Sequence, residues 1–127
     1  MIALDKEETM STSTTNTDVF ADVDRMDAKA FASHLAEDCV LRFGNADEVV
    51  GRAAIEEAIA GFFTTINGIS HQIVNQWNVD DTTITQLEAT YTRKDDRQVT
   101  VPAVAVWRRG ELIDDYRIYV DQAPVYA

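Results

Sequence analysis

The stretch RAAIEEAIAGFFTTINGISHQIVNQWNV, residues 52–79, contains two kinds of hydrophobic spacing, and the change between them decides the fold. Before Asn67-Gly68 the apolar residues recur every three or four positions, which is typical of an amphipathic helix. After it they alternate, which is typical of a strand, and Asn-Gly is a common helix end. The stretch therefore predicts a helix over 52–66 and a strand over 69–79. The apolar positions of the helix are Ile55, Ile59, Phe62, Phe63 and Ile66.

Three further segments downstream, residues 84–93, 98–108 and 111–120, also read as strands. Short polar connections join them, and such connections are typical of antiparallel neighbours in a meander. With 69–79 they predict four long strands in one sheet.

The chain before residue 52 predicts helices and short strands. Residues 18–26 read as a first helix, and Asp27 suits the N-cap of a second helix over 28–36. Residues 38–43 and 48–50 read as two short strands around a turn. Helices followed by a run of strands indicate an α+β fold, with the helices packed on one face of a curved sheet.

Composition limits the possible partners of the protein. The 127 residues, 46% of them hydrophobic, fit a single globular domain. We expect residues 1–16 to be a flexible leader and residues 17–127 to be the domain. The net charge of -11 argues against nucleic acid or an anionic membrane as a partner. Without a signal-like segment or an apolar run of about 18 residues, the expected location is cytoplasmic.

Asp24 and His71 are the candidate polar groups of the core. Read at helical spacing, Asp24 falls on the apolar stripe that Phe20 and Val23 define in the first helix. His71 follows Ile69 on the apolar side of its strand. Because burying an unpaired charge is costly, a carboxylate at this position needs a partner, and His71 is the best candidate. The alternative is that Asp24 only caps a helix break and His71 is an ordinary core histidine.

As a pair, these side chains would support acid–base chemistry. The carboxylate would orient the imidazole and stabilise its protonated form, so that His71 acts as a general base. Tyr91 is a candidate hydrogen-bond donor to a substrate carbonyl or enolate, and the alternative for it is a packing role. His34, the other histidine, is expected to be solvated. The sequence contains no metal-binding or phosphate-binding motif, so no metal or cofactor is expected.

The segment 99–107 is apolar on both of its faces. Helices can cover only one face of such a strand, so the other face needs a separate cover. A second copy of the chain is the simplest cover, and we therefore expect a homodimer.

Five motifs follow one another in an order that is specific for one fold: DRMD at 24–27, LAEDCV at 35–40, GRAAI at 51–55, His71, and DDYRIYVD at 114–121. In this order the chain, over roughly residues 17–124, resembles the SnoaL-like group of the nuclear transport factor two-like superfamily. The resemblance implies a cone of three helices wrapped by a strongly curved, mostly antiparallel sheet. It also implies that the outer face of the sheet often forms a dimer.

The resemblance implies several possible activities. Family members include ketosteroid isomerases, polyketide cyclases, epoxide hydrolases, dehydratases, a dehydrochlorinase and non-catalytic binders. In the scytalone dehydratase and dehydrochlorinase branch the catalytic pair occupies the positions that Asp24 and His71 match here. Val23 stands where scytalone dehydratase has a tyrosine, so that full site is absent. The epoxide hydrolase activity is rejected, because its Asp–Arg–Asp set is missing at the matching positions Leu41, Phe43, Ala89, Tyr91 and Ile118.

The strand faces and the resemblance together predict one apolar internal cavity with few polar groups. The expected function is that of a cofactor-independent lyase or isomerase on a small hydrophobic molecule, with Asp24, His71 and Tyr91 as catalytic residues. The alternative is a non-catalytic domain that binds a small ligand in the same cavity. The other expected lining residues are Phe20, Val23, Leu41, Phe43, Phe63, Trp77, Ala89 and Ile118.

Overall fold

The computed structural model describes residues 16–127, so the expected leader lies outside the described residues except for Asn16. Four helices and six strands make up this part of the chain. In chain order they are α1 (Asn16–Asp24), α2 (Ala28–Ala32), β2 (Leu35–Phe43), β3 (Val49–Val50), α3 (Arg52–Phe63), β4 (Gly68–Val79), β5 (Thr82–Thr92), β6 (Gln98–Arg109), β7 (Ile113–Val120) and α4 (Ala123–Tyr126).

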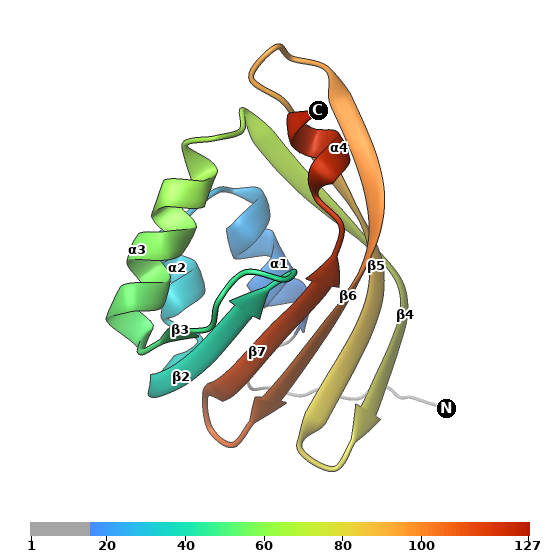
Figure 1. Ribbon diagram of the computed structural model, residues 1–127. Coiled ribbons are helices and arrows are strands. Elements are labelled where there is room, and N and C mark those ends of the chain that lie inside the picture. Colours follow the sequence, from blue (N-terminus) through green and yellow to red (C-terminus); the bar gives the residue numbers. More distant parts are fainter. Residues whose placement is uncertain (1–15) are drawn as a thin grey trace.

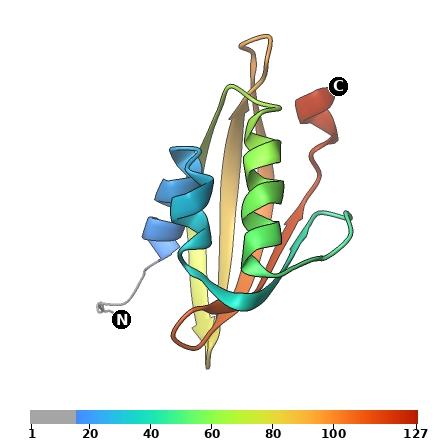
Figure 2. The ribbon, with the colours of Figure 1, turned by 90° about the vertical axis from the view of Figure 1, so that its left-hand side faces the viewer.

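The six strands form one curved sheet in the order β3-β2-β7-β6-β5-β4. All neighbours are antiparallel except β2 and β7, which run parallel. Helices α1, α2 and α3 lie in the concave face of the sheet, and α4 lies at one end (Figures 1 and 2). The predicted α+β class, with helices in the concave face of a strongly curved, mostly antiparallel sheet, is confirmed. Among the described helices, none has the length and apolar character that a membrane crossing requires.

The helix predicted over residues 28–36 is shorter than expected. Asp27 is its N-cap, as predicted, and its side chain accepts a hydrogen bond from the backbone N–H of Ala30. The helix ends at Ala32, because Leu35 already pairs with Ile113 in the parallel β2–β7 ladder. Sheet pairing, which needs a partner 78 positions away, overrides the local helical pattern.

Helix α3 also ends before its predicted boundary at residue 66. Its last residue is Phe63, and the hydroxyls of Thr64 and Thr65 donate to the carbonyls of Gly61 and Phe62 at 2.6 and 2.7 Å. Threonine side chains that bond to backbone carbonyls satisfy the end of a helix and compete with its continuation.

A β-bulge in β4 corrects the predicted faces of this strand. Ile73 pairs with Leu87, but Asn75 pairs with the next residue, Gln86, so Val74 is an extra residue without a pairing partner in the register. An extra residue reverses the alternation of side chains beyond it. The predicted inner face is therefore correct from Ile69 to Ile73 and wrong for Trp77, which lies on the outer face.

Candidate active site

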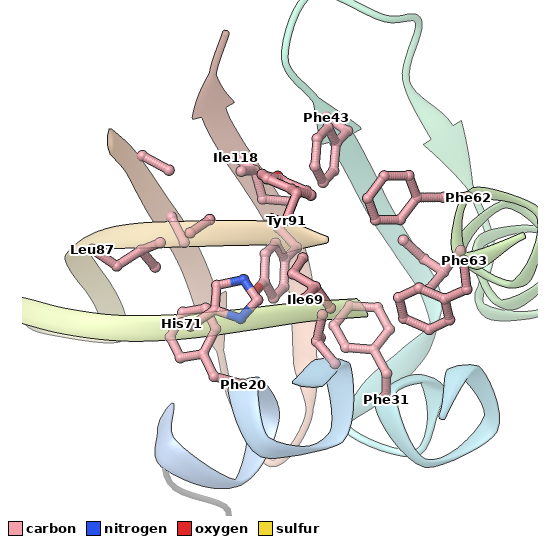
Figure 3. A pocket seen from close by; sticks show the side chains of 16 residues that line it. Phe20, Phe31, Phe43, Phe62, Phe63, Ile69, His71, Leu87, Tyr91 and Ile118 are labelled. Atoms are coloured by element: carbon pink, nitrogen blue, oxygen red, sulfur yellow. The ribbon is translucent and has the colours of Figure 1, made fainter. Parts of the chain in front are cut away.

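A cavity lies between the helices and the concave face of the sheet. Its volume is about 50 Å³, and sixteen side chains line it (Figure 3). Thirteen of these are apolar, and only His71, Tyr91 and Tyr116 carry polar atoms. The apolar members are Phe20, Val23, Phe31, Phe43, Ile59, Phe62, Phe63, Ile69, Leu87, Ala89, Ala103, Ala105 and Ile118.

Asp24, the last residue of α1, is paired with His71 on β4. Its Oδ1 atom lies 2.5 Å from Nδ1 of His71, and the backbone N–H of His71 donates to Oδ2 at 3.3 Å. The imidazole also contacts the ring of Phe20, with 5.0 Å between the ring centroids. The His71 side chain is 10% exposed and that of Asp24 is 31% exposed. The carboxylate of Asp24 is therefore partly exposed to solvent, while the imidazole of His71 lies in the apolar wall of the cavity.

This geometry assigns different tasks to the two imidazole nitrogens. A carboxylate only accepts hydrogen bonds, so Nδ1 of His71 is the protonated nitrogen and donates to Asp24. The other nitrogen, Nε2, then carries the lone pair in the neutral ring. Two hydrogen bonds from His71 to one carboxylate also fix the orientation of the ring relative to α1. The pair can accept a proton at Nε2 and stabilise the resulting charge through Asp24.

Tyr91 lies in the cavity wall on β5, opposite Ile69 in the β4–β5 register. It is 2% exposed, and its hydroxyl accepts a hydrogen bond of 3.1 Å from Nε2 of Gln122. Burial raises the pKa of Tyr91 above its ordinary value of 10.0, and the hydrogen bond from Gln122 only partly opposes this. The phenol therefore stays protonated at neutral pH and can act as a donor.

The structure corrects two predicted lining residues. Leu41 is a core residue of β2, 3% exposed, and is not part of the cavity wall. Trp77 is 48% exposed on the outer face, because the bulge at Val74 reverses the strand before it. The other six predicted lining residues lie in the wall: Phe20, Val23, Phe43, Phe63, Ala89 and Ile118.

Eight lining residues and Gln122 were not predicted from the sequence. The helical spacing of apolar residues in α3 includes Ile59 and Phe62, so this spacing could have predicted them as lining residues. Tyr116 lies two positions before Ile118 on the same strand, so the alternation of strand faces could have predicted it too. No pattern in the sequence indicates Gln122 as a site residue, because only the fold brings it next to Tyr91. The missed lining residues are Phe31, Ile59, Phe62, Ile69, Leu87, Ala103, Ala105 and Tyr116.

His34 is not solvated, contrary to the prediction. Its side chain is 12% exposed, and its Nε2 atom lies 2.6 Å from Oδ2 of Asp22. The other oxygen of Asp22 bonds to the guanidinium of Arg25. Neither His34 nor Asp22 lines the cavity. This second pair therefore joins α1 to the end of α2 outside the cavity wall.

Other reactive groups in the described part of the chain offer little chemistry. Cys39 is fully buried, and burial together with nearby carboxylates, first that of Asp115, raises its pKa to about 12. Such a thiol is a poor nucleophile at neutral pH. Within residues 16–127, no group of three or more His, Cys, Asp or Glu side chains could hold a metal ion.

Comparison with known proteins supports one family and one fold. The chain matches the family model of the SnoaL-like domain over residues 17–118. A hypothetical protein from Catenulispora acidiphila with a ketosteroid isomerase-like fold, solved with trimethylamine, is similar in structure with a TM-score of 0.79, 20% identity and coverage of 86% of each chain. No curated protein matches the chain in sequence.

Two further solved structures have the same fold. A putative SnoaL-like polyketide cyclase from Jannaschia has a TM-score of 0.73 and 14% identity, with 95% of each chain covered. An epoxide hydrolase from M. tuberculosis has a TM-score of 0.73 and 13% identity, with 87% of this chain and 82% of that chain covered. At such identities the likeness extends to the fold and not to the activity.

Proposed function

This chain belongs to the SnoaL-like domain family, and from that premise we propose that it is a lyase or isomerase that acts without a cofactor on a small hydrophobic molecule. The single observation that carries the proposal is the 2.5 Å contact between Asp24 and His71 at the wall of an apolar cavity. A titratable residue in a cavity wall, with a charged partner beside it, is a common arrangement of an active site.

In the proposed reaction, Nε2 of His71 removes a proton from a carbon next to a substrate carbonyl. The electron pair of the broken C–H bond moves onto the carbonyl oxygen, and the hydroxyl of Tyr91 donates a hydrogen bond to that oxygen. Asp24 stabilises the imidazolium. An isomerase returns the proton to another carbon of the substrate. A lyase uses the electron pair to expel a leaving group on the next carbon, and the imidazolium protonates that group.

The cavity supports this chemistry over epoxide hydrolysis. Among its sixteen lining residues there is no carboxylate and no guanidinium, and the wall is mostly aromatic or aliphatic. One basic nitrogen and two phenols are suited to proton transfer at a neutral, apolar substrate. A charged substrate would find no opposite charge in this wall.

The test has two stages. A thermal-shift screen of small cyclic and aromatic ketones identifies ligands, because binding to the native state raises the midpoint of unfolding. Each hit is then incubated in D₂O with the protein, and deuterium entry at the carbon next to the carbonyl, or loss of a leaving group, is followed by NMR. We expect His71→Gln to lower the rate about 10²–10⁴-fold while the ligand still binds. Equal rates in the wild-type and variant proteins would contradict the proposal.

The second candidate function is a non-catalytic domain that holds a small ligand in the same cavity. The mostly apolar wall supports it, because a ligand could bind there through hydrophobic contacts alone. The same experiment separates the two candidates. A pure binder gives thermal shifts with no exchange and no elimination, and both binding and stability then depend on the aromatic residues more than on Asp24.

We also propose that the outer face of the sheet forms a homodimer. None of the helices in residues 16–127 lies on this convex side (Figure 1), and Trp77, Val79 and Tyr119 are 48%, 57% and 58% exposed there. Exposed apolar residues of this size on a sheet face are typical of protein–protein contacts. Val104 and Val106 alternate outward on β6 beside them and make the face continuous.

A further inference from the structure

The C-terminal segment, residues 122–126, is tied to elements on both sides of the cavity. At its start, Nε2 of Gln122 donates to the hydroxyl of Tyr91 on β5 at 3.1 Å. At its end, the hydroxyl of Tyr126 lies 2.9 Å from Oγ1 of Thr65, just after α3. The segment thus connects the sheet with the end of α3, at one end of the molecule (Figure 1).

Two further contacts fix the backbone of this segment. Val125 is 3% exposed and belongs to the hydrophobic core, and the guanidinium of Arg93 donates to the carbonyl of Pro124 at 3.3 Å. The side chain of Asp121 accepts from the backbone N–H of Ala123 at 3.0 Å, which sets the turn after β7. Gln122 is therefore held in place on both sides by contacts that do not involve Tyr91.

The direction of the Gln122–Tyr91 hydrogen bond matters for the cavity. The amide group donates and the phenol oxygen accepts, so this bond does not use the proton of the Tyr91 hydroxyl. An acceptor in the place of the Gln122 amide, such as a carboxylate, would instead take the proton of the Tyr91 hydroxyl. The amide also restricts the direction of the Tyr91 O–H about the Cζ–O bond, because the donor is itself fixed in the C-terminal segment.

We propose that Gln122 is a positioning residue for Tyr91. It holds the phenol oxygen from the side of the C-terminal segment and leaves the phenol proton for an acceptor atom of the substrate in the cavity. The importance of this arrangement for catalysis rests on the proposed role of Tyr91 as a donor. The arrangement itself is a property of the free protein and is measurable without a substrate.

Two variants separate positioning from packing. Gln122→Met removes the amide donor and keeps an unbranched side chain. Gln122→Glu keeps the shape but supplies an acceptor at neutral pH, which reverses the hydrogen bond. Gln72→Met, on the exposed outer face of β4, is the matched control. The readout is the Cζ resonance of Tyr91 in protein labelled with ¹³C-tyrosine, assigned with Tyr91→Phe and titrated at alkaline pH while circular dichroism shows folded protein.

We expect both Gln122 variants to move the Tyr91 resonance at neutral pH and to raise the pKa of Tyr91, because the bond from Gln122 lowers it in the wild-type protein. The resonance of Tyr116 and the Gln72→Met control should stay unchanged. A Tyr91 resonance and pKa that are the same in Gln122→Met and wild-type protein would overturn the inference, even if His71 proves catalytic. Conversely, the expected shifts without any deuterium exchange would support the positioning while the proposed reaction fails.

Discussion

Asp22 and Asp24 lie two residues apart on α1, and each carboxylate binds a histidine of a different segment. Side chains at this spacing leave a helix about 200° apart, so the two carboxylates face different parts of the fold. Only the Asp24–His71 pair includes a residue of the cavity wall. The Asp22–His34 pair therefore serves as an internal control for every test of the first pair.

The Asp24–His71 pair should be energetically coupled. Asp24→Ala leaves a mostly buried imidazole without its partner, which should lower the free energy of unfolding by about 1–3 kcal/mol. If the native pair is instead electrostatically unfavourable, the change could be neutral or stabilising while activity is lost. Either result requires coupling, so a double-mutant cycle with His71→Ala, measured by urea denaturation, decides the question. Additivity within about 0.3–0.5 kcal/mol would show that the two residues are independent.

Replacing Asp22 should affect stability and leave the cavity unchanged. Asp22→Asn weakens the contacts with His34 and Arg25 and should cost about 1–3 kcal/mol, because Asp22 is 9% exposed. Asp24→Asn should change the ¹⁵N resonances of the His71 ring, since an amide can also present a donor to Nδ1. The same resonances should not move in Asp22→Asn. A shift of the His71 signals of equal size in both variants would contradict the separation of the two pairs.

The positions of Asp24 on the inner stripe of α1 and of His71 on the inner side of β4 were accessible from the sequence, because each position depends on local spacing. Phe20 and Asp24 share a helical stripe, and Ile69 and His71 alternate on a strand. The same spacing brings Asp24 and His71 together in the structure. Local periodicity thus predicted the residues of one face, although 47 positions separate the two partners.

Features that depend on distant backbone pairing were not accessible. The helical pattern through Leu35 gave no sign of its parallel pairing with Ile113. No residue pattern in β4 indicates the bulge at Val74, so the predicted inner side of this strand was wrongly extended to Trp77. The contact between Asp22 and His34 depends on where α2 ends, and that end is itself set by the sheet.

The Cys39 thiol should be unreactive in the native protein. Its pKa of about 12 leaves almost no thiolate at pH 8. We therefore expect Cys39 to react with a disulfide reagent only after the protein unfolds. The raised pKa also makes stability depend on pH. Above the ordinary value of 9.0 the unfolded thiol loses its proton and the folded one does not, so this contribution to stability falls between about pH 9 and pH 12.

Two measurements check this prediction for Cys39. The rate of the thiol reaction should rise with urea in step with unfolding measured by circular dichroism. Cys39→Ala should then show a smaller loss of stability than the wild type between pH 9 and pH 11. Fast labelling in native buffer, at the rate of a free thiol, would show that the site is open.

The outer face of the sheet offers the last test. If two copies pack through it, Trp77→Lys places a charge into the contact, and burying an unpaired charge there should weaken the dimer. Trp77 does not line the cavity, so ligand binding within each protomer should persist. Ala58→Lys, at an exposed position of α3 on the other side of the molecule, is the matched control. Light scattering should give twice 14.2 kDa for the wild type and Ala58→Lys, and a mass closer to 14.2 kDa for Trp77→Lys. A wild-type mass near 14.2 kDa at micromolar concentration would refute the dimer and leave the apolar outer face to another partner.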